Sequence, residues 1–79
     1  MNGLKYIRSE VIREKAEDLA AQLRISKQTV TAWESGKKQI PHKRLKQLSE
    51  LTGIPEQYFL LKELTEQEKL ECKKYWLRI

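Results

Sequence analysis

Apolar residues recur at intervals of three and four along the whole chain, and this helical spacing limits the fold more than any other feature. One apolar stripe begins at Leu4, a second begins at Leu19, and a third consists of Leu45, Leu48 and Leu51. The alternation of apolar and polar residues that marks a half-buried strand is missing, and so are runs of β-branched residues. The spacing therefore predicts an all-α protein with five short helices and an additional C-terminal helix.

Residues with special backbone or capping properties predict where the middle helices begin and end. Ser26 is placed to cap a helix that stops at Gly36, because serine accepts a hydrogen bond from the first turn and glycine tolerates a positive φ. Pro41 suits the first turn of the next helix, which should end near Gly53.

The last two helices have their own start signals. Pro55 opens a fifth, short helix that contains Tyr58 and Phe59. Thr65 and Glu68 match a capping box, with threonine at the N-cap and glutamate three residues later, so a last helix should begin here.

Positive charge is concentrated in the middle of the chain. The 79 residues include 16 lysines and arginines against 11 acids, a net charge of +5. The window from Arg24 to Lys46 holds seven of the basic residues and one acid, Glu34, so it carries +6 and the rest of the chain −1. Such a surface fits a polyanionic partner, either nucleic acid or acidic lipid, and the alternative is a solvated basic face without a partner.

Residues that could support catalysis or hold a metal are few. Cys72 is the one cysteine and His42 the one histidine, so neither an internal disulfide nor a cysteine- or histidine-rich metal site can form. No nucleophile–base pair is evident, no run approaches the roughly 18 apolar residues of a membrane span, and the first residues lack a signal pattern. We therefore expect a cytoplasmic binding domain, not an enzyme, without a cofactor, metal, small-molecule ligand or membrane partner.

The segments on either side of Ile25 carry the pattern of a helix-turn-helix. Such a motif needs a small residue where its two helices cross, and Ala20 supplies it. It needs an apolar residue in the turn, which is Ile25, and apolar anchors on the second helix, which are Val30 and Trp33. The outer side of this second helix is polar or small, which suits insertion into the major groove of DNA.

This motif and the segments after it resemble the lambda-repressor/Cro type of helix-turn-helix, also called the XRE family. The matching residues are Leu19-Ala20-x-x-Leu23-x-Ile25-Ser26-x-x-Thr29-Val30-x-x-Trp33-Glu34-x-Gly36-Lys37, Leu45-x-x-Leu48-x-x-Leu51-x-Gly53-Ile54 and Tyr58-Phe59. The resemblance spans residues 4–61 and implies a five-helix lambda-repressor-like DNA-binding domain over residues 1–61, with a C-terminal helix in residues 62–79. It also implies a structural bond from Glu34 toward the first helix.

The family's five-helix core further implies a break in the first part of the chain. Apolar spacing continues from Leu4 to Leu23 without Gly, Pro or Asn, so spacing alone would permit one long helix there. The resemblance places a break near Arg13 to Ala16.

Three positions depart from the family's pattern. Arg24 stands where a turn glycine is usual, and a left-handed conformation there would cost about 1–2 kcal/mol, unless the turn differs. Ala16 stands where the family often has a glutamine that touches a phosphate, so the resemblance does not carry that contact over. The junction of the first two helices lacks its usual small turn residue.

The resemblance implies two sets of DNA contacts. Amide and ammonium groups can bond the edges of adenine and guanine, and the methyl groups of Thr and Ala can meet a thymine methyl. The expected base contacts are Lys27, Gln28, Thr29, Thr31 and Ala32. The expected phosphate contacts are Ser26, Lys37, Lys38, Gln39, His42 and Lys43. The alternatives are an ordinary polar helix surface for the first set, a purely capping role for Ser26, and simple exposure for His42.

A last apolar stripe lies near the end of the chain. Cys72, Tyr75, Trp76 and Ile79 fall on one side of the expected C-terminal helix. The stripe must cover the chain's own core, a twin subunit, or a further domain if the chain is a fragment. Core cover and dimer contact are the two main expectations.

These observations favour a sequence-specific regulator of transcription that binds double-stranded DNA. We expect a repressor of bacterial or phage origin that binds its operator as a homodimer, with recognition helices about 34 Å apart in successive major grooves. An antitoxin of a toxin–antitoxin pair is an alternative within the same fold. A protein-interaction module that works through its C-terminal helix is an alternative from another class.

Overall fold

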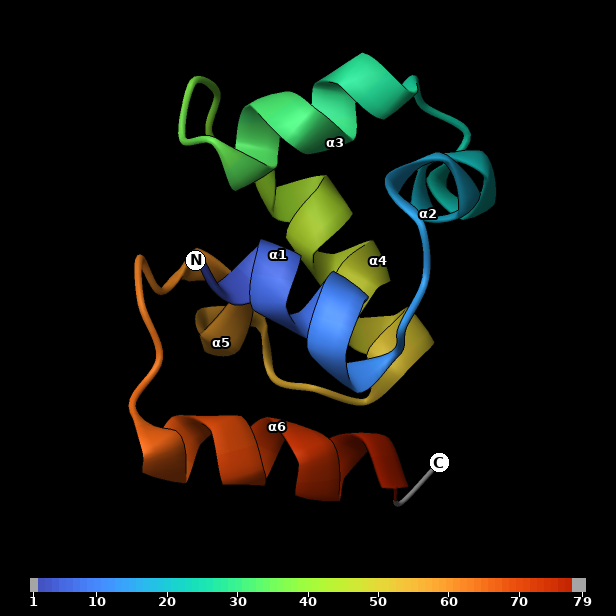
Figure 1. Cartoon of the computed structure of the whole chain (residues 1–79). Helices are drawn as coiled ribbons and strands as arrows, with labels where there is room; N and C mark the ends of the chain where they lie inside the picture. The colour runs from blue at the N-terminus through green and yellow to red at the C-terminus, as the bar shows by residue number, and fades with distance from the viewer. Residues whose placement is uncertain (1, 78–79) are drawn as a thin grey trace.

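The computed structural model describes residues 2–77, and all regular structure in this range is helical (Figure 1). The elements are α1 (Gly3–Tyr6), η1 (Ile7–Val11), α2 (Ala16–Leu23), α3 (Lys27–Glu34), α4 (His42–Thr52), α5 (Glu56–Leu60) and α6 (Glu66–Leu77). Because the π-helical turn η1 continues α1 directly, the two form one helical segment. The predicted all-α architecture with a C-terminal helix is confirmed.

The first helical segment ends where the chain takes a left-handed conformation. The Ile12 N–H group donates to the Ile7 carbonyl at 2.9 Å, which closes the π-helical turn. Arg13 then has a φ of 54°, and α2 does not begin until Ala16. The continuous apolar stripe is therefore divided between two helices, and the break implied near Arg13 to Ala16 is confirmed.

The start of α1 packs directly against α5. The Gly3 N–H group donates to the Leu61 carbonyl at 2.7 Å, and a Cβ at Gly3 would lie 1.8 Å from the Tyr58 carbonyl oxygen. Only a residue without a side chain permits this approach. The Asn2 side chain caps α1 by accepting a hydrogen bond from the Lys5 N–H group at 2.9 Å.

A single apolar core lies between the helices. Its most deeply buried side chains come from every helix of the described chain and from the α4–α5 link, and they include Leu4, Ile7, Leu19, Leu23, Val30, Leu48, Ile54, Phe59 and Cys72. α3 lies on one side of this core and α6 on the opposite side (Figure 1).

Two sequence expectations for α4 need correction. Pro41 is the N-cap residue and precedes the first helical turn, in which it was expected to lie. Leu51 is 42% exposed, whereas Thr52 is buried beside Leu48. Leu45, Leu48 and Thr52 share the buried face of α4, whereas Leu51 lies about 60° beyond Leu48 and about 120° from Leu45, at the edge of that face. The Thr52 hydroxyl donates to the Leu48 carbonyl at 2.8 Å, so its burial leaves no polar group unsatisfied.

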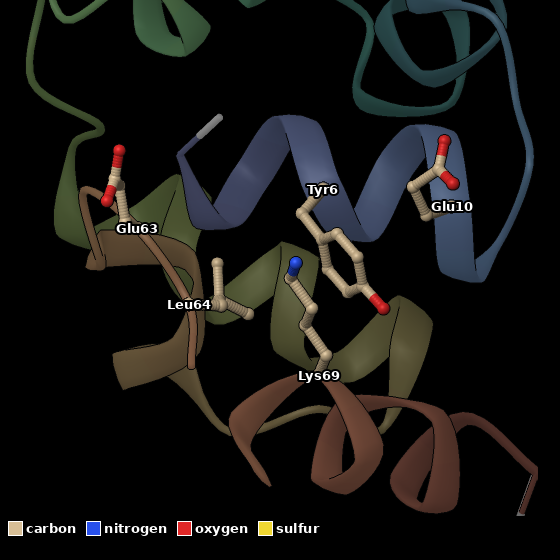
Figure 2. A pocket seen from close by; sticks show the side chains of 5 residues that line it. All are labelled: Tyr6, Glu10, Glu63, Leu64 and Lys69. Carbon is tan, nitrogen blue, oxygen red and sulfur yellow. The ribbon is translucent and has the colours of Figure 1, made fainter. Parts of the chain in front are cut away.

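The capping box predicted for α6 is present. The Thr65 hydroxyl accepts a hydrogen bond from the Glu68 N–H group at 3.2 Å, and the Glu68 carboxylate accepts one from the Thr65 N–H group at 2.8 Å. α6 then crosses the first helical segment, where the Lys69 ammonium group lies 5.6 Å from the centre of the Tyr6 ring (Figure 2). Glu10, Glu63 and Leu64 complete the lining of a cavity of about 450 Å³ at this crossing.

Candidate nucleic-acid interface

The turn between α2 and α3 keeps its left-handed geometry although no glycine is present. Arg24 has φ and ψ angles of 59° and 45°. The Ile25 N–H group donates to the Ala20 carbonyl at 3.0 Å, and the Arg24 N–H group donates to the Ala21 carbonyl at 3.2 Å. This pair of bonds is a Schellman motif and satisfies carbonyl groups at the end of α2. Arg24 therefore takes the strained conformation that the family usually gives to glycine.

Both ends of α3 are fixed by side chains. At its start, the Ser26 hydroxyl accepts a hydrogen bond from the Thr29 N–H group at 3.2 Å, so the predicted capping role is confirmed. At its end, Gly36 has a φ of 80°, and the Asn2 side-chain amide donates to the Trp33 carbonyl at 3.0 Å. The orientation of α3 is thus tied to the first residues of the chain.

The inner side of α3 is anchored by apolar burial and by one ion pair. Val30 and Trp33 are buried, as expected. The Arg8 guanidinium donates to both carboxylate oxygens of Glu34, at 2.5 and 3.2 Å, and to the Glu14 carbonyl at 2.8 Å. Such a forked pair fixes direction as well as distance. The implied structural role of Glu34 is confirmed.

Three supporting residues were not identified from the sequence. Arg8 and Asn2 hold α3, and Arg44 donates from one guanidinium nitrogen to the Leu23 carbonyl at 3.0 Å, which braces the end of α2. The isolated position of Glu34 in a basic window was the one signal for a buried pair. Nothing in the sequence indicates which basic residue pairs with Glu34.

The predicted base contacts all lie on α3 but differ in exposure. Lys27, Gln28 and Thr31 are exposed, whereas Thr29 and Ala32 are half-buried. The Thr29 hydroxyl lies 2.9 Å from the Ser26 hydroxyl and belongs to the cap. The Thr31 hydroxyl donates to the Gln28 carbonyl at 3.0 Å. Of the polar side chains in this set, only the Lys27 ammonium and the Gln28 amide form no hydrogen bond or ion pair within residues 2–77.

The predicted phosphate contacts lie on the α3–α4 loop, on the start of α4 beside it, and on the start of α3 at the far end of that helix. Lys37, Lys38 and Gln39 are exposed in the loop between α3 and α4, and the Lys38 N–H group donates to the Ala32 carbonyl at 3.2 Å. His42 and Lys43 are exposed in the first turn of α4, and Ser26 is exposed at the start of α3.

Electrostatics at the start of α4 combine a helix end with an ion pair. Pro41 gives α4 no side-chain cap, so the N–H groups of its first turn stay open to an anion. His42 Nε2 lies 3.4 Å from a carboxylate oxygen of Glu56, so Glu56 would compete with a phosphate for this imidazole.

A protein-family model described as Helix-turn-helix matches residues 12–59, more than half of the chain. The chain belongs to the helix-turn-helix family. This is the lambda-repressor/Cro type that the sequence resembles, a family of DNA-binding regulatory domains. No curated protein and no solved structure gives a significant match.

The matched region of this helix-turn-helix domain contains α2 to α5, while α6 lies outside it. α2 and α3 form the motif, and α4 and α5 support it. The described part of the chain contains no helix long and apolar enough to cross a membrane. It also contains no group of three or more His, Cys, Asp or Glu residues placed to hold a metal.

The apolar stripe of α6 lies largely against the helix-turn-helix domain itself. Cys72 is 0% exposed, and Tyr75 and Trp76 are half-buried against the core. The rings of Tyr58 and Tyr75 have centres 5.9 Å apart, and the Tyr58 hydroxyl donates to Glu71 at 3.1 Å. Ile79, the fourth residue expected in the stripe, lies outside the described residues.

Burial raises the pKa of two groups where α6 packs on the core, Tyr58 of α5 and Cys72 of α6. Burial first, and then the nearby Glu68 and Glu71 carboxylates, raise the pKa of Cys72 to about 11. Burial and the hydrogen bond to Glu71 raise the pKa of Tyr58 to about 12. Both groups are therefore protonated at neutral pH, and the Cys72 thiol is a poor nucleophile.

Proposed function

We propose that this protein is a repressor of bacterial or phage origin that binds a specific operator in duplex DNA within the cytoplasm. The observation that carries the proposal is the exposed start of α3, where Lys27 and Gln28 keep free polar groups, with the lysine-bearing loop at the other end of the same helix. The one acid of the basic window, Glu34, is turned into the fold by Arg8 and does not oppose a phosphate backbone.

Each group has a role that follows from its chemistry. Gln28 can bond adenine through both donor and acceptor of its amide, and Lys27 can donate to guanine. Thr29, Thr31 and Ala32 would contribute methyl contacts, since the two hydroxyls are already bonded within α3. The residues assigned to the phosphates, which position the helix without selecting a base, are Ser26, Lys37, Lys38, Gln39, His42 and Lys43.

Residues 1–61 form the DNA-binding part in this proposal, and residues 62–79 cover its core. Removal of α6 would take Cys72 out of the core and uncover the apolar side chains around it. This arrangement gives no support to an interaction module that works through the apolar stripe of α6.

Two copies of the chain would bind one operator. A single module rarely reaches the affinity of about 10⁻⁸ M or better that specific regulators need, whereas two half-sites can supply it. Cys72 has no surface to offer a partner, so Tyr75 and Trp76 are the remaining candidates for the contact within the described residues. Sedimentation of the Trp76→Lys variant beside a Leu70→Lys control tests this, because loss of self-association in the Trp76 variant alone is expected.

Selection of bound sequences from a random duplex pool tests the proposed function. A palindromic consensus with half-sites one helical turn apart is expected. A reporter gene placed behind that sequence should then be transcribed less when the protein is present. A pool that shows no consensus after selection would contradict sequence-specific binding.

A further inference from the structure

A groove beside the proposed phosphate-binding loop combines apolar walls with a basic rim. It has a volume of about 580 Å³ and lies between the α3–α4 loop, the start of α4, and the end of α5. Its apolar lining includes Trp33, Ile40, Phe59 and Leu60. The loop and α5 lie on the same side of the molecule (Figure 1).

One apolar side chain of the groove, Leu60, is unusually exposed to solvent. Leu60 is 58% exposed at the end of α5, although most other apolar residues of the helix-turn-helix core are buried. Ile40 and Leu61 are half-buried beside it. Apolar surface that is concave and accessible favours an apolar side chain of a partner.

The charges on the rim are all of one sign. Lys38, His42 and Lys62 line the groove, and the lining contains no acidic residue. Neither lysine forms an ion pair within residues 2–77. His42 contacts Glu56, which does not line the groove. The occupant that complements this surface carries carboxylates next to apolar side chains.

We infer that this groove is a docking site for an acidic, apolar peptide segment of a partner protein, which displaces DNA when it binds. A phosphate backbone would satisfy the lysines but would leave the apolar walls exposed to water. A second copy of this chain is a poorer match, because it carries the same net charge of +5 and approaches a basic rim.

Competition with DNA follows from shared residues. Lys38, Gln39 and His42 line the groove and also belong to the proposed phosphate contacts. A segment held in the groove therefore occupies cations that the DNA backbone needs. This second part of the inference rests on the proposed function, whereas binding of the peptide itself does not.

The test begins with a displayed library of random short peptides, selected on the full chain in the absence of DNA. Peptides enriched in Asp or Glu next to Leu, Ile, Phe or Trp are expected. No enrichment above the starting library, or enrichment of basic peptides, would overturn the inference.

A selected peptide, labelled with a fluorophore, is then titrated with variants and matched controls. Leu60→Ser should weaken peptide binding by about tenfold, whereas Leu70→Ser, which removes a similarly exposed leucine from α6, should leave it unchanged. Lys62→Glu should weaken binding and flatten its salt dependence, whereas Lys73→Glu on α6 should do neither. Equal effects of variant and control would place the peptide elsewhere and overturn the inference.

Measurements with DNA separate this inference from the proposed function. Leu60→Ser should bind operator DNA as the native chain does, and the native chain should release DNA as peptide is added. If peptide binds the groove but duplex DNA never binds, the proposed function fails and the docking site stands. If Leu60→Ser abolishes self-association of the chain, the groove is an interface between copies, and the peptide site is overturned.

Discussion

At the scale of single residues, two arginines adopt left-handed backbone conformations at turns where the family usually has a small residue. Arg24 occupies a left-handed turn in which glycine is usual, and Arg13 does the same at the end of the first helical segment. Arg8 neutralises Glu34, the one acid of the basic window, and ties α3 to the first helix. α3 is therefore positioned in part by side chains outside the proposed set of DNA contacts.

Arg24→Gly should stabilise the fold. Glycine removes the steric cost of the left-handed conformation, about 1–2 kcal/mol, while it adds about 0.4–1 kcal/mol of entropy to the unfolded chain. We expect the free energy of unfolding in urea to rise by about 0.5–1 kcal/mol. Lys46→Gly, on the exposed side of α4, is the control and should lower it by about 1 kcal/mol. A loss of stability in both variants would show that Arg24 is not strained.

At the scale of elements, helix ends were predictable and the contacts between helices were not. Ser26, Gly36, Gly53 and the Thr65 capping box act on their own backbone within a few residues, so the sequence indicates them directly. The exposure of Leu51 and the partner of Glu34 depend on how distant helices meet. The π-helical turn η1 also has no local signal in the sequence.

The loop between α3 and α4 should control the salt dependence of DNA binding. Replacing Lys37 and Lys38 by Ala should weaken binding to every duplex sequence, because these ammonium groups release counterions from phosphates. The slope of log K against log salt concentration should become shallower by about 0.9 for each lost phosphate contact. Lys73→Ala on α6 is the control. An unchanged slope in the loop variant would show that this loop does not touch the backbone.

The burial of Cys72 between α6 and the core should make the free energy of unfolding depend on pH in the alkaline range. Below pH 9 the thiol is protonated in both states, and above it the thiol of the unfolded chain ionises first, because the pKa of the folded state is about 11. The free energy of unfolding should therefore fall between pH 9 and pH 11, by up to about 1.4 kcal/mol per pH unit from this group.

Denaturant unfolding of the native chain and of Cys72→Ala over this range is the measurement. The difference between the native chain and the Cys72→Ala variant isolates Cys72, because Tyr58 and Tyr6, whose pKa values burial also raises, are present in both proteins. Equal pH slopes in the two proteins, or rapid reaction of the folded thiol with a disulfide reagent, would mean that Cys72 is not buried between α6 and the core.

At the scale of the whole molecule, the proposed DNA contacts and α6 lie on opposite sides of the chain. α3 and the basic loop lie away from α6, and the apolar core separates them (Figure 1). The sequence predicted the family, because the resemblance over residues 4–61 agrees with the family match over residues 12–59. It could not predict that α6 covers the core with Cys72, since an apolar stripe at the end of a chain fits several partners.

Specific recognition by α3 is the central claim, and the binding of Gln28→Ala to a set of operator variants tests it most directly. Gln28 is exposed and its side-chain amide is free within the described residues. Its replacement should relax the base preference at one position of each half-site, at a cost of about 1–3 kcal/mol on the cognate sequence and little on other DNA. A uniform loss of affinity across all sequences, with the preference at every position intact, would contradict base recognition by Gln28 and would place this residue on the phosphate backbone.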